Sequence, residues 1–289
     1  MAGPRRDTRG IIDAPELFAQ VRFRRREPAA ALRPYLEHYW LIDWDLTRPY
    51  VSHLVPHPSV NVVFQHFAEQ EPFGEVAGIG LELFTQKLEG RGLVRGVQFR
   101  PGGFRPFAPQ WPVSRWTGQR LPVAEALPTT EAEIATILAP AGPGAGTGPG
   151  AGTGADDAAV AALDTYLLGV ADLGEPGGPA EPDPQVALAM RLADRIRTDR
   201  TVRRVASLAE TEGISARSLQ RLFATYVGVG PKWVILRYRI HEALERAESS
   251  EGAEVDWAEL AAELGYSDQA HLVRDFTATV GVPPTAYAR

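Results

Sequence analysis

The sequence predicts an α+β protein in which a β-rich amino-terminal domain precedes an all-α carboxy-terminal domain. Three observations support this class. Residues 35–107 contain short segments rich in β-branched and aromatic side chains and separated by glycines. The last third of the chain has apolar residues at helical spacing, and one pattern in it occurs twice. A length of 289 residues with 44% hydrophobic residues suffices for two domains, each with its own core.

Residues 1–30 are rich in arginine and have two interpretations. They form a basic arm that follows a DNA minor groove, or a solvated tail that runs into an edge strand. The second is favoured, because no known arm motif is present. The arginines concerned are Arg5, Arg6, Arg9, Arg22, Arg24, Arg25 and Arg26.

Residues 31–172 are predicted to form a β-rich regulatory or dimerisation domain. Trp40, Ile42 and Trp44 occupy alternate positions, as in a half-buried strand. The segment 61–67 is a second strand candidate, and further short segments follow up to residue 107. We expect these strands to form a curved sheet or a small cupin-like barrel.

Four of the six histidines lie in this domain, at His38, His53, His57 and His66. A metal site needs two or three converging imidazoles and a carboxylate. His53 and His57 would be about 13 Å apart along a strand. Prolines on both sides of His57 indicate a turn instead. We therefore expect no metal ion, and no other cofactor is indicated.

The segment VRGVQFRPGGFRPF, residues 94–107, has a glycine pair flanked by Arg100 and Arg105. Glycines free backbone N–H groups to converge and arginines supply charge, so the segment is a candidate site for an anionic small-molecule effector. A glycine-proline turn between strands has the same sequence pattern. Both interpretations stay open at the level of the sequence.

The end of the first domain combines helices with low-complexity segments. A helix is predicted from Thr130, where Glu133 completes a capping box. Residues 139–155 are Gly, Ala and Pro apart from two threonines, and they predict a flexible surface loop. From Asp156 an amphipathic helix is expected, which docks on the β-rich domain or pairs with its twin in a homodimer, with docking favoured. Residues 173–183 form a Pro-rich linker.

The carboxy-terminal domain, residues 184–289, contains the segment LAETEGISARSLQRLF at 208–223. It predicts two short helices with Gly213 at the turn and Ser215 as N-cap of the second. Such a second helix can enter a DNA major groove, where arginine pairs with guanine and glutamine with adenine. An ordinary helical hairpin whose polar face meets water is the alternative. The polar face carries Arg217, Gln220 and Arg221.

Residues 260–276, LAAELGYSDQAHLVRDF, repeat this pattern with one extra residue. A Gly-Val-x-Pro segment follows each copy, which makes the duplication a strong signal. Between the copies, residues 231–250 predict one long helix. Its length would hold the copies about 34 Å apart, one turn of DNA.

The region 184–289 resembles the DNA-binding domain of AraC/XylS-type transcription regulators, most specifically in GYSDQAHLVRDF and GVPPTAYAR. The resemblance implies base-reading positions at Arg217, Gln220 and Arg221 in the first copy. In the second copy it implies Gln269, Ala270, Val273 and Arg274. The predicted DNA-binding residues are Ser215, Arg217, Ser218, Gln220, Arg221, Gln269, His271 and Arg274.

The two copies differ in their side chains and in their charge. Ala270 and Val273 correspond to Arg217 and Gln220, and neither can hydrogen-bond a base edge. Acidic residues outnumber basic ones around the second copy, and the reverse holds around the first. We expect phosphate attraction to concentrate on the first copy, which then dominates base reading. Its basic residues are Arg200, Arg203, Arg204, Arg217, Arg221, Lys232, Arg237 and Arg239.

The front half is similar to an uncharacterised amino-terminal domain found on a subset of AraC-type regulators. The similarity lies in LRPYLEHYW, PHPSVNVVF, FTQKLEGRG and GVQFRPGGFRPF. It implies a regulatory role, through sensing of a small effector, dimerisation or both.

The whole composition narrows the class of function. A net charge of −6 argues against non-specific coating of DNA but not against a locally basic face. The chain has no cysteine, no apolar run of membrane-spanning length and no leader, so we expect a cytoplasmic protein without membrane contact. Abundant Ala, Arg, Gly and Pro indicate a bacterial source. No catalytic motif is present, so we expect no enzyme.

We therefore predict a sequence-specific transcription regulator that binds double-stranded DNA, with RNA polymerase as a further partner if it activates transcription. The alternative is a regulator-derived interaction protein. Its amino-terminal domain would bind another protein, and its DNA contact would be secondary.

Overall fold

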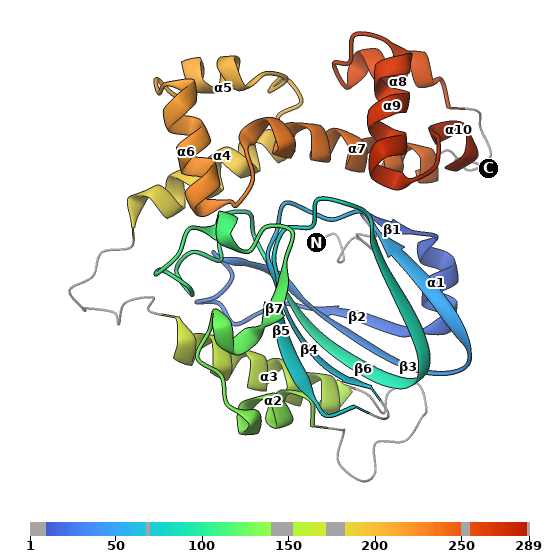
Figure 1. The fold of residues 1–289 in the computed structure, drawn as a ribbon, viewed down its shortest axis with the longest axis vertical. Helices are drawn as coiled ribbons and strands as arrows, with labels where there is room; N and C mark the ends of the chain where they lie inside the picture. The colour runs from blue at the N-terminus through green and yellow to red at the C-terminus, as the bar shows by residue number, and fades with distance from the viewer. Residues whose placement is uncertain (1–9, 68–69, 140–152, 172–182, 250–254, 288–289) are drawn as a thin grey trace.

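The computed structural model describes residues 10–67, 70–139, 153–171, 183–249 and 255–287. Figure 1 shows a curved sheet with its helices in the lower part of the molecule and the helices from Pro184 onward in the upper part. The predicted α+β class, with the β-rich part first, is confirmed. The linker at 173–182, most of the loop at 139–155 and Arg5, Arg6 and Arg9 lie outside the described residues.

The strands form one antiparallel sheet in the order β1-β3-β6-β4-β5-β7, with β2 also paired to β3. Within the described ranges no pairing joins β7 to β1 or β2, so the sheet is open. The cupin-like barrel is therefore wrong and the curved sheet is right. The strands are β1 Ile11–Ile12, β2 Arg22–Arg26, β3 Leu36–Leu54, β4 Asn61–Phe67, β5 Phe73–Ala77, β6 Phe84–Phe99 and β7 Arg120–Pro122.

The long antiparallel pair of β3 and β6 forms the spine of the sheet. Its ladder shifts register between Leu46 and Tyr50, where Pro49 has no N–H to donate. Two glycines of β6 let tryptophan rings from β3 lie across the strand. A Cβ on Gly96 would come within 1.9 Å of the Trp40 ring, and one on Gly92 within 2.3 Å of the Trp44 ring.

Helix α3, Thr153–Val170, docks against the sheet, where it contacts β2 and β3. The Asp156 carboxylate accepts hydrogen bonds from Arg24 at 2.7 and 2.9 Å. Burial alone would raise the pKa of Asp156, but hydrogen bonds and charge from Arg24 hold that pKa below its ordinary value. Further along the helix, the Tyr39 hydroxyl donates to Asp164 at 2.8 Å. The acidic face of α3 thus neutralises the arginine-rich strand.

The other helices of the β-rich part are short. Helix α2 begins at the predicted capping box: the Glu133 amide donates to Thr130 Oγ1, and the Thr130 amide donates to Glu133 Oε2. These elements are α1 Ala14–Gln20, α2 Glu131–Ile137 and two 3-10 turns, η1 Val113–Arg115 and η2 Val123–Glu125.

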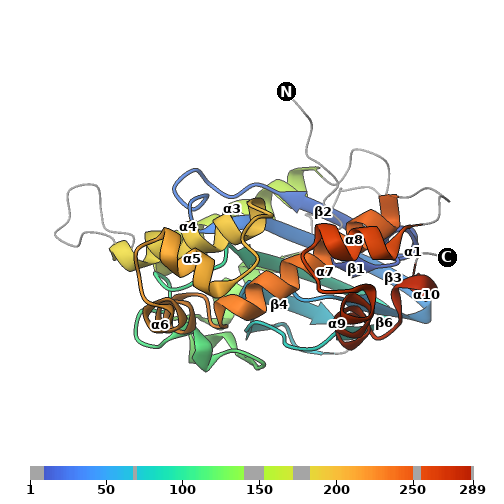
Figure 2. The ribbon, with the colours of Figure 1, turned by 90° about the horizontal axis from the view of Figure 1, so that it is seen from above.

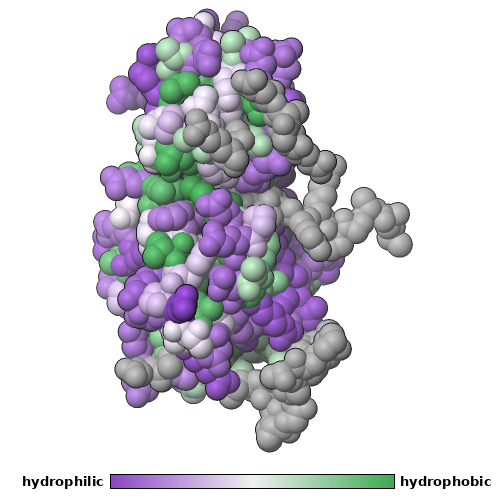
Figure 3. Space-filling view, turned by 90° about the vertical axis from the view of Figure 1, so that its right-hand side faces the viewer, coloured by the Kyte–Doolittle hydropathy of each residue, from purple (hydrophilic) through white to green (hydrophobic). Residues whose placement is uncertain are grey.

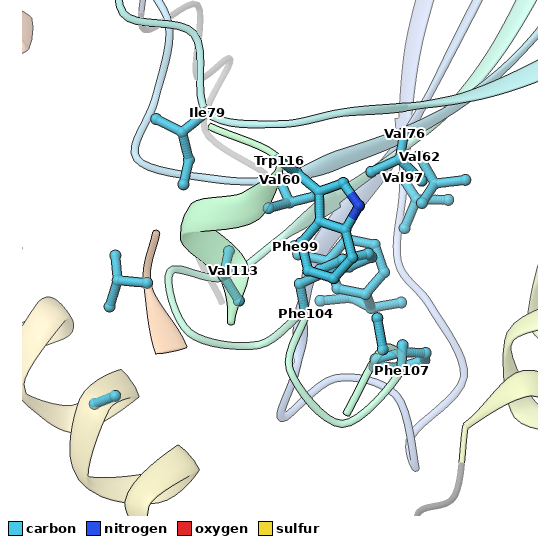
Figure 4. Close-up of a cluster of buried hydrophobic side chains, with 14 of the residues drawn as sticks. Val60, Val62, Val76, Ile79, Val97, Phe99, Phe104, Phe107, Val113 and Trp116 are labelled. Carbon is cyan, nitrogen blue, oxygen red and sulfur yellow. The ribbon is translucent and has the colours of Figure 1, made fainter. Parts of the chain in front are cut away.

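An aromatic cluster fills the centre of the β-rich part (Figure 4). Phe99 meets Phe104 and Phe107 edge to face at centroid distances of 5.1 and 5.0 Å, and Phe104 meets Trp116 at 5.3 Å. The same cluster of buried residues continues into Leu192 and Leu219 of the upper part. The two parts therefore share one hydrophobic core.

The upper part is all helical, with a long horizontal helix α7 that carries a helical pair at each end (Figure 1). Asp183 caps α4 and Pro184 occupies its first turn, as expected for a helix start. The helices are α4 Pro184–Thr198, α5 Val205–Thr211, α6 Ala216–Tyr226, α7 Pro231–Ser249, α8 Trp257–Glu263, α9 Gln269–Val280 and α10 Pro284–Tyr287.

The segment Gly78–Leu83, between β5 and β6, runs along the helical part and contacts it at three places. Ile79 packs against Gly228 at the end of α6. The Leu81 carbonyl accepts a hydrogen bond from Arg237 of α7 at 3.0 Å. Leu83 lies against Gly281 at the end of α9. We call this segment the bridging loop, because it contacts both helical pairs and the helix between them.

Further contacts hold the two parts together. Thr117 Oγ1 donates to the Gly228 carbonyl at 2.7 Å. The rings of His57 and His241 stack with centroids 4.0 Å apart. In the side view of Figure 3, hydrophobic surface shows between the upper and lower parts, whereas both extremities are mostly hydrophilic.

Candidate nucleic-acid interface

The first helical pair, α5 and α6, is the helix-turn-helix that the sequence predicts. Gly213 adopts φ +65°, which a turn between the two helices requires. Ser215 caps α6, because its hydroxyl oxygen accepts a hydrogen bond from the Ser218 amide at 3.0 Å. Leu219 and Phe223 are fully buried against the rest of the core. Because this side of α6 is buried, the opposite side of the helix is the one that faces solvent.

The open side of α6 carries the predicted reading residues. Arg217, Gln220 and Arg221 are all exposed and lie on one face of the helix. In the part of the chain that the structure describes, neither arginine forms an ion pair. The β-rich part meets α6 at its far end, around Tyr226 and Gly228, and leaves this face uncovered.

The second helical pair, α8 and α9, repeats the arrangement with a longer turn. Gly265 adopts φ +76°, matching Gly213. The N-cap of α9 is Asp268, whose carboxylate accepts a hydrogen bond from the His271 amide at 2.7 Å. Ser267, the sequence counterpart of Ser215, lies one position before the cap. The extra residue noted in the sequence is thus located in the turn. Asp268 lies four residues before Leu272, as Ser215 lies four residues before Leu219, so the register of the repeat could have revealed this cap.

The predicted residues of α9 divide into exposed and engaged side chains. Gln269, Ala270 and Arg274 are exposed. His271 Nδ1 lies 3.3 Å from Ser267 Oγ, and its Nε2 lies 3.7 Å from an Asp275 carboxylate oxygen. His271 is therefore held within its own helix-turn-helix.

Helix α7 sets the separation of the two pairs. Its 19 residues span about 28 Å at the α-helical rise, close to one turn of DNA. Seen from above in Figure 2, α6 and α9 are both viewed nearly end-on, along the same edge of the molecule. The two helices are therefore roughly parallel, as insertion into successive grooves of one DNA face requires.

Several basic residues expected around the first pair are not available for phosphate. Arg237 is buried under the bridging loop, 5% exposed. Arg239 donates to the Arg203 carbonyl, and Arg200 forms an ion pair with Glu242. These arginines bind carbonyl and carboxylate groups of α7 or of the segments that pack on it. A count of charged residues along the sequence does not reveal such contacts. Besides Arg200, the exposed basic residues near α6 are Arg203, Arg204, Arg217, Arg221 and Lys232, of which Arg203 donates to the Glu263 carbonyl at 2.9 Å.

The predicted effector residues Arg100 and Arg105 do not converge on one site. Arg105 donates to the carbonyls of Ala108 and Trp111 at 3.1 and 2.8 Å, so its guanidinium stabilises the loop that contains it. Arg100 donates to the Leu36 carbonyl at 3.3 Å and borders a cavity of about 250 Å³. The turn interpretation of Gly102 and Gly103 is therefore the better one.

The cavity beside Arg100 lies between the β-rich part and helix α4. Its wall includes Glu37, His57, Asp194 and Arg197, so both parts of the chain contribute. Among the described residues, no group of three or more His, Cys, Asp or Glu is placed to hold a metal ion. No described helix has the length and apolarity needed to span a membrane.

Two protein-family models match the chain. Residues 24–122 match a family described as Domain of unknown function (DUF6597), and residues 208–289 match the Helix-turn-helix domain family. The second match contains both helical pairs and α7 between them. The curated proteins contain no match to this chain.

Two solved structures are similar to this chain. The C-terminal domain of AraT, a response regulator from Geobacillus stearothermophilus, is 24% identical, with 38% of this chain and 88% of that chain covered and a TM-score of 0.33. An apo ToxT variant from Vibrio cholerae is 11% identical, with 91% and 98% covered and a TM-score of 0.40.

The AraC-type pattern in the sequence, the matching domain model and the paired helices agree. The chain carries a helix-turn-helix domain of the AraC type at its carboxy terminus and a domain of unknown function at its amino terminus.

Proposed function

We propose that this protein is a sequence-specific transcription regulator in which the first helix-turn-helix leads base reading. The helix-turn-helix domain supports a DNA-binding regulator as the general class. The finer assignment rests on one observation: Arg217, Gln220 and Arg221 share an exposed face of a capped helix. Arginine and glutamine are the side chains that pair bidentately with guanine and adenine in the major groove.

The second helix-turn-helix acts as a weaker, positioning unit. Its open face offers Gln269 and Arg274, while Ala270 and Val273 replace the central reading residues. Apolar side chains at these positions can contact a thymine methyl but cannot hydrogen-bond a base. Ser215 and Ser218 contact a DNA phosphate at the start of α6, where backbone N–H groups favour anions.

The β-rich part acts as the regulatory domain, by binding a small effector, by dimerisation or by both. The cavity between this part and α4 supports the first role, because a ligand bound there would contact both parts at once. We divide the chain into a regulatory domain, residues 31–172, and a DNA-binding domain, residues 184–289, by these proposed roles. The two domains share a hydrophobic core.

A selection from a random pool of DNA duplexes tests the proposal. Full-length protein is expected to enrich two short boxes about one turn apart, with most information in one box. Binding to that duplex is then measured at matched salt for Arg221→Ala, Arg274→Ala and the control Arg91→Ala in β6.

We expect a loss of affinity of about 10- to 100-fold for Arg221→Ala, about threefold or less for Arg274→Ala and none for Arg91→Ala. Equal losses for the first two variants would contradict the leading role of the first pair. If the wild-type protein enriches no motif, with or without small-molecule additives, the alternative of a protein-binding module is favoured.

A further inference from the structure

One loop of the β-rich part ends beside the recognition helix. The segment from Arg105 to Thr117 carries η1 and approaches α6 just beyond its last turn. In Figure 2 this loop lies on the same edge of the molecule as α6 and α9. The two reading helices and this loop therefore face the same side.

The loop is anchored to the end of α6 by several contacts. Val113 is buried, and a Cβ on Gly228 would come within 2.9 Å of its side chain. Thr117 Oγ1 donates to the Gly228 carbonyl at 2.7 Å. The Arg105 guanidinium lies 5.9 Å from the centre of the Tyr226 ring, at the last residue of α6. The position of η1 relative to α6 is thus fixed at both of its ends.

Two large side chains of this anchored loop project into solvent. Trp111 is 44% exposed, which is unusual for an indole. Arg115 is exposed, and its guanidinium stacks on the Trp111 ring at 4.4 Å. Arg115 forms no ion pair with any residue in the described ranges. The pair is a preorganised cation that no carboxylate among the described residues neutralises.

The dimensions of DNA indicate what this cation meets. Helix α6 has 11 residues and is about 16 Å long, whereas the major groove is about 12 Å wide and bounded by two rows of phosphates. A helix that lies in the groove has a row of phosphates on each side, so a cation held just beyond its end is within reach of the DNA backbone. Phosphate is the anion present there.

We propose that Arg115, oriented by Trp111, is a DNA-backbone contact supplied by the amino-terminal domain. This inference rests on the proposed function. It makes the domain of unknown function part of the DNA-binding surface itself. An arginine on phosphate adds affinity and orientation but carries no base preference.

Titrations of full-length protein at several salt concentrations test the inference. The probe is a duplex bearing the motif that the wild-type protein selects, and a scrambled duplex serves as the non-specific reference. For Arg115→Ala we expect about fivefold weaker binding to both duplexes and a salt dependence lower by about one phosphate contact. The selected motif should not change.

Two further variants test whether the effect comes from the charge of Arg115 at its position in the loop. Arg115→Lys should keep the salt dependence, because it keeps the charge. Arg91→Ala removes an exposed arginine of the same domain in β6 and should leave binding unchanged. An unchanged salt dependence in Arg115→Ala, with the wild-type protein bound normally, would overturn the inference alone. Failure of the wild-type protein to bind any duplex would overturn the proposed function as well.

Discussion

The buried guanidinium of Arg237 carries a desolvation cost that no carboxylate in the described ranges offsets. Its Nη2 donates to the Leu81 carbonyl, it stacks at 4.5 Å from the Trp233 ring centre, and its Nη1 has no hydrogen-bond partner there. Burial alone lowers the pKa of Arg237 to about 10. Burial of the Arg237 charge between the bridging loop and α7 therefore lowers the stability of the folded protein.

Replacement of Arg237 by Met should therefore stabilise the protein. The variant keeps much of the apolar length and removes the buried charge, so we expect the Tm to rise by about 2–4 °C. Arg239→Met is the matched control, because Arg239 is on the same helix, donates to a carbonyl and stacks on Tyr266, but is not under the bridging loop. A fall in Tm for Arg237→Met in scanning calorimetry would contradict the expectation.

Helix caps determine where the reading helices start. Ser215 and Asp268 bind the first free amides of α6 and α9, and each sets the rotation of the exposed face that follows. Ser215 was predictable from the sequence, because a Gly turn, a cap and periodic apolar residues are local signals. Asp268 was missed, because counting forward from the glycine aligns Ser267 with Ser215, whereas counting back from Leu272 gives Asp268.

Loss of the Ser215 cap should destabilise α6 selectively. We expect Ser215→Ala to lower the free energy of unfolding by about 1 kcal/mol in urea titrations and to weaken DNA binding. Ser207→Ala, in the interior of α5, should be neutral or slightly stabilising, since alanine is the better helix former. Equal effects of the two substitutions would show that the hydroxyl of Ser215 does not act as a cap.

The docking of α3 depends on charge pairs distant in sequence, which no local pattern could predict. Arg24 and Asp156 are 132 residues apart. The amphipathic pattern indicates the helix and favours docking over dimer pairing, but it does not identify the docking partners. The sheet order was hidden for the same reason, because the pairing of β3 with β6 joins strands that are not neighbours in the chain.

Acid should weaken this docking through Asp156. Its pKa is lowered in the folded chain, so its stabilising contribution is complete above about pH 4, the ordinary value for aspartate, and is lost as the pH falls through the folded pKa. In urea titrations, the difference in free energy of unfolding between wild type and Asp156→Asn should therefore disappear as the pH is lowered through the folded pKa. Asp157→Asn, which removes a 68% exposed carboxylate paired with Arg26, should show little difference at any pH.

At the scale of the whole molecule, the two parts behave as one body. The sequence predicts separate cores joined by a Pro-rich linker, because composition marks linkers but does not reveal which surfaces meet. The shared cluster runs from Phe99 in the sheet to Leu192 and Leu219 in the helices. A ligand of the proposed regulatory domain would therefore act by altering a packed interface, since the two parts are already in contact.

Gly228 should be the most sensitive point of that interface. It has φ +99°, and an added Cβ would come within 2.6 Å of Ile79 and 2.9 Å of Val113. We expect Gly228→Ala to lower the Tm by about 4 °C or more, from backbone strain and forced separation. Gly230→Ala is the control, with nothing within 4 Å of its Cβ position, and should be nearly neutral. Similar Tm values for the two variants would argue against the interface.

The bridging loop limits how this protein can diverge. Ile79, Leu81 and Leu83 contact the end of α6, the middle of α7 and the end of α9 in turn. The intervening Gly78 and Gly80 have no room for a side chain, since a Cβ there would come within 1.7 Å of the Trp116 carbonyl oxygen and 2.8 Å of Pro56. Most surface loops accept insertions and deletions during evolution. A change in the length of this one would detach a helical pair, so relatives that share the docked arrangement should keep its length.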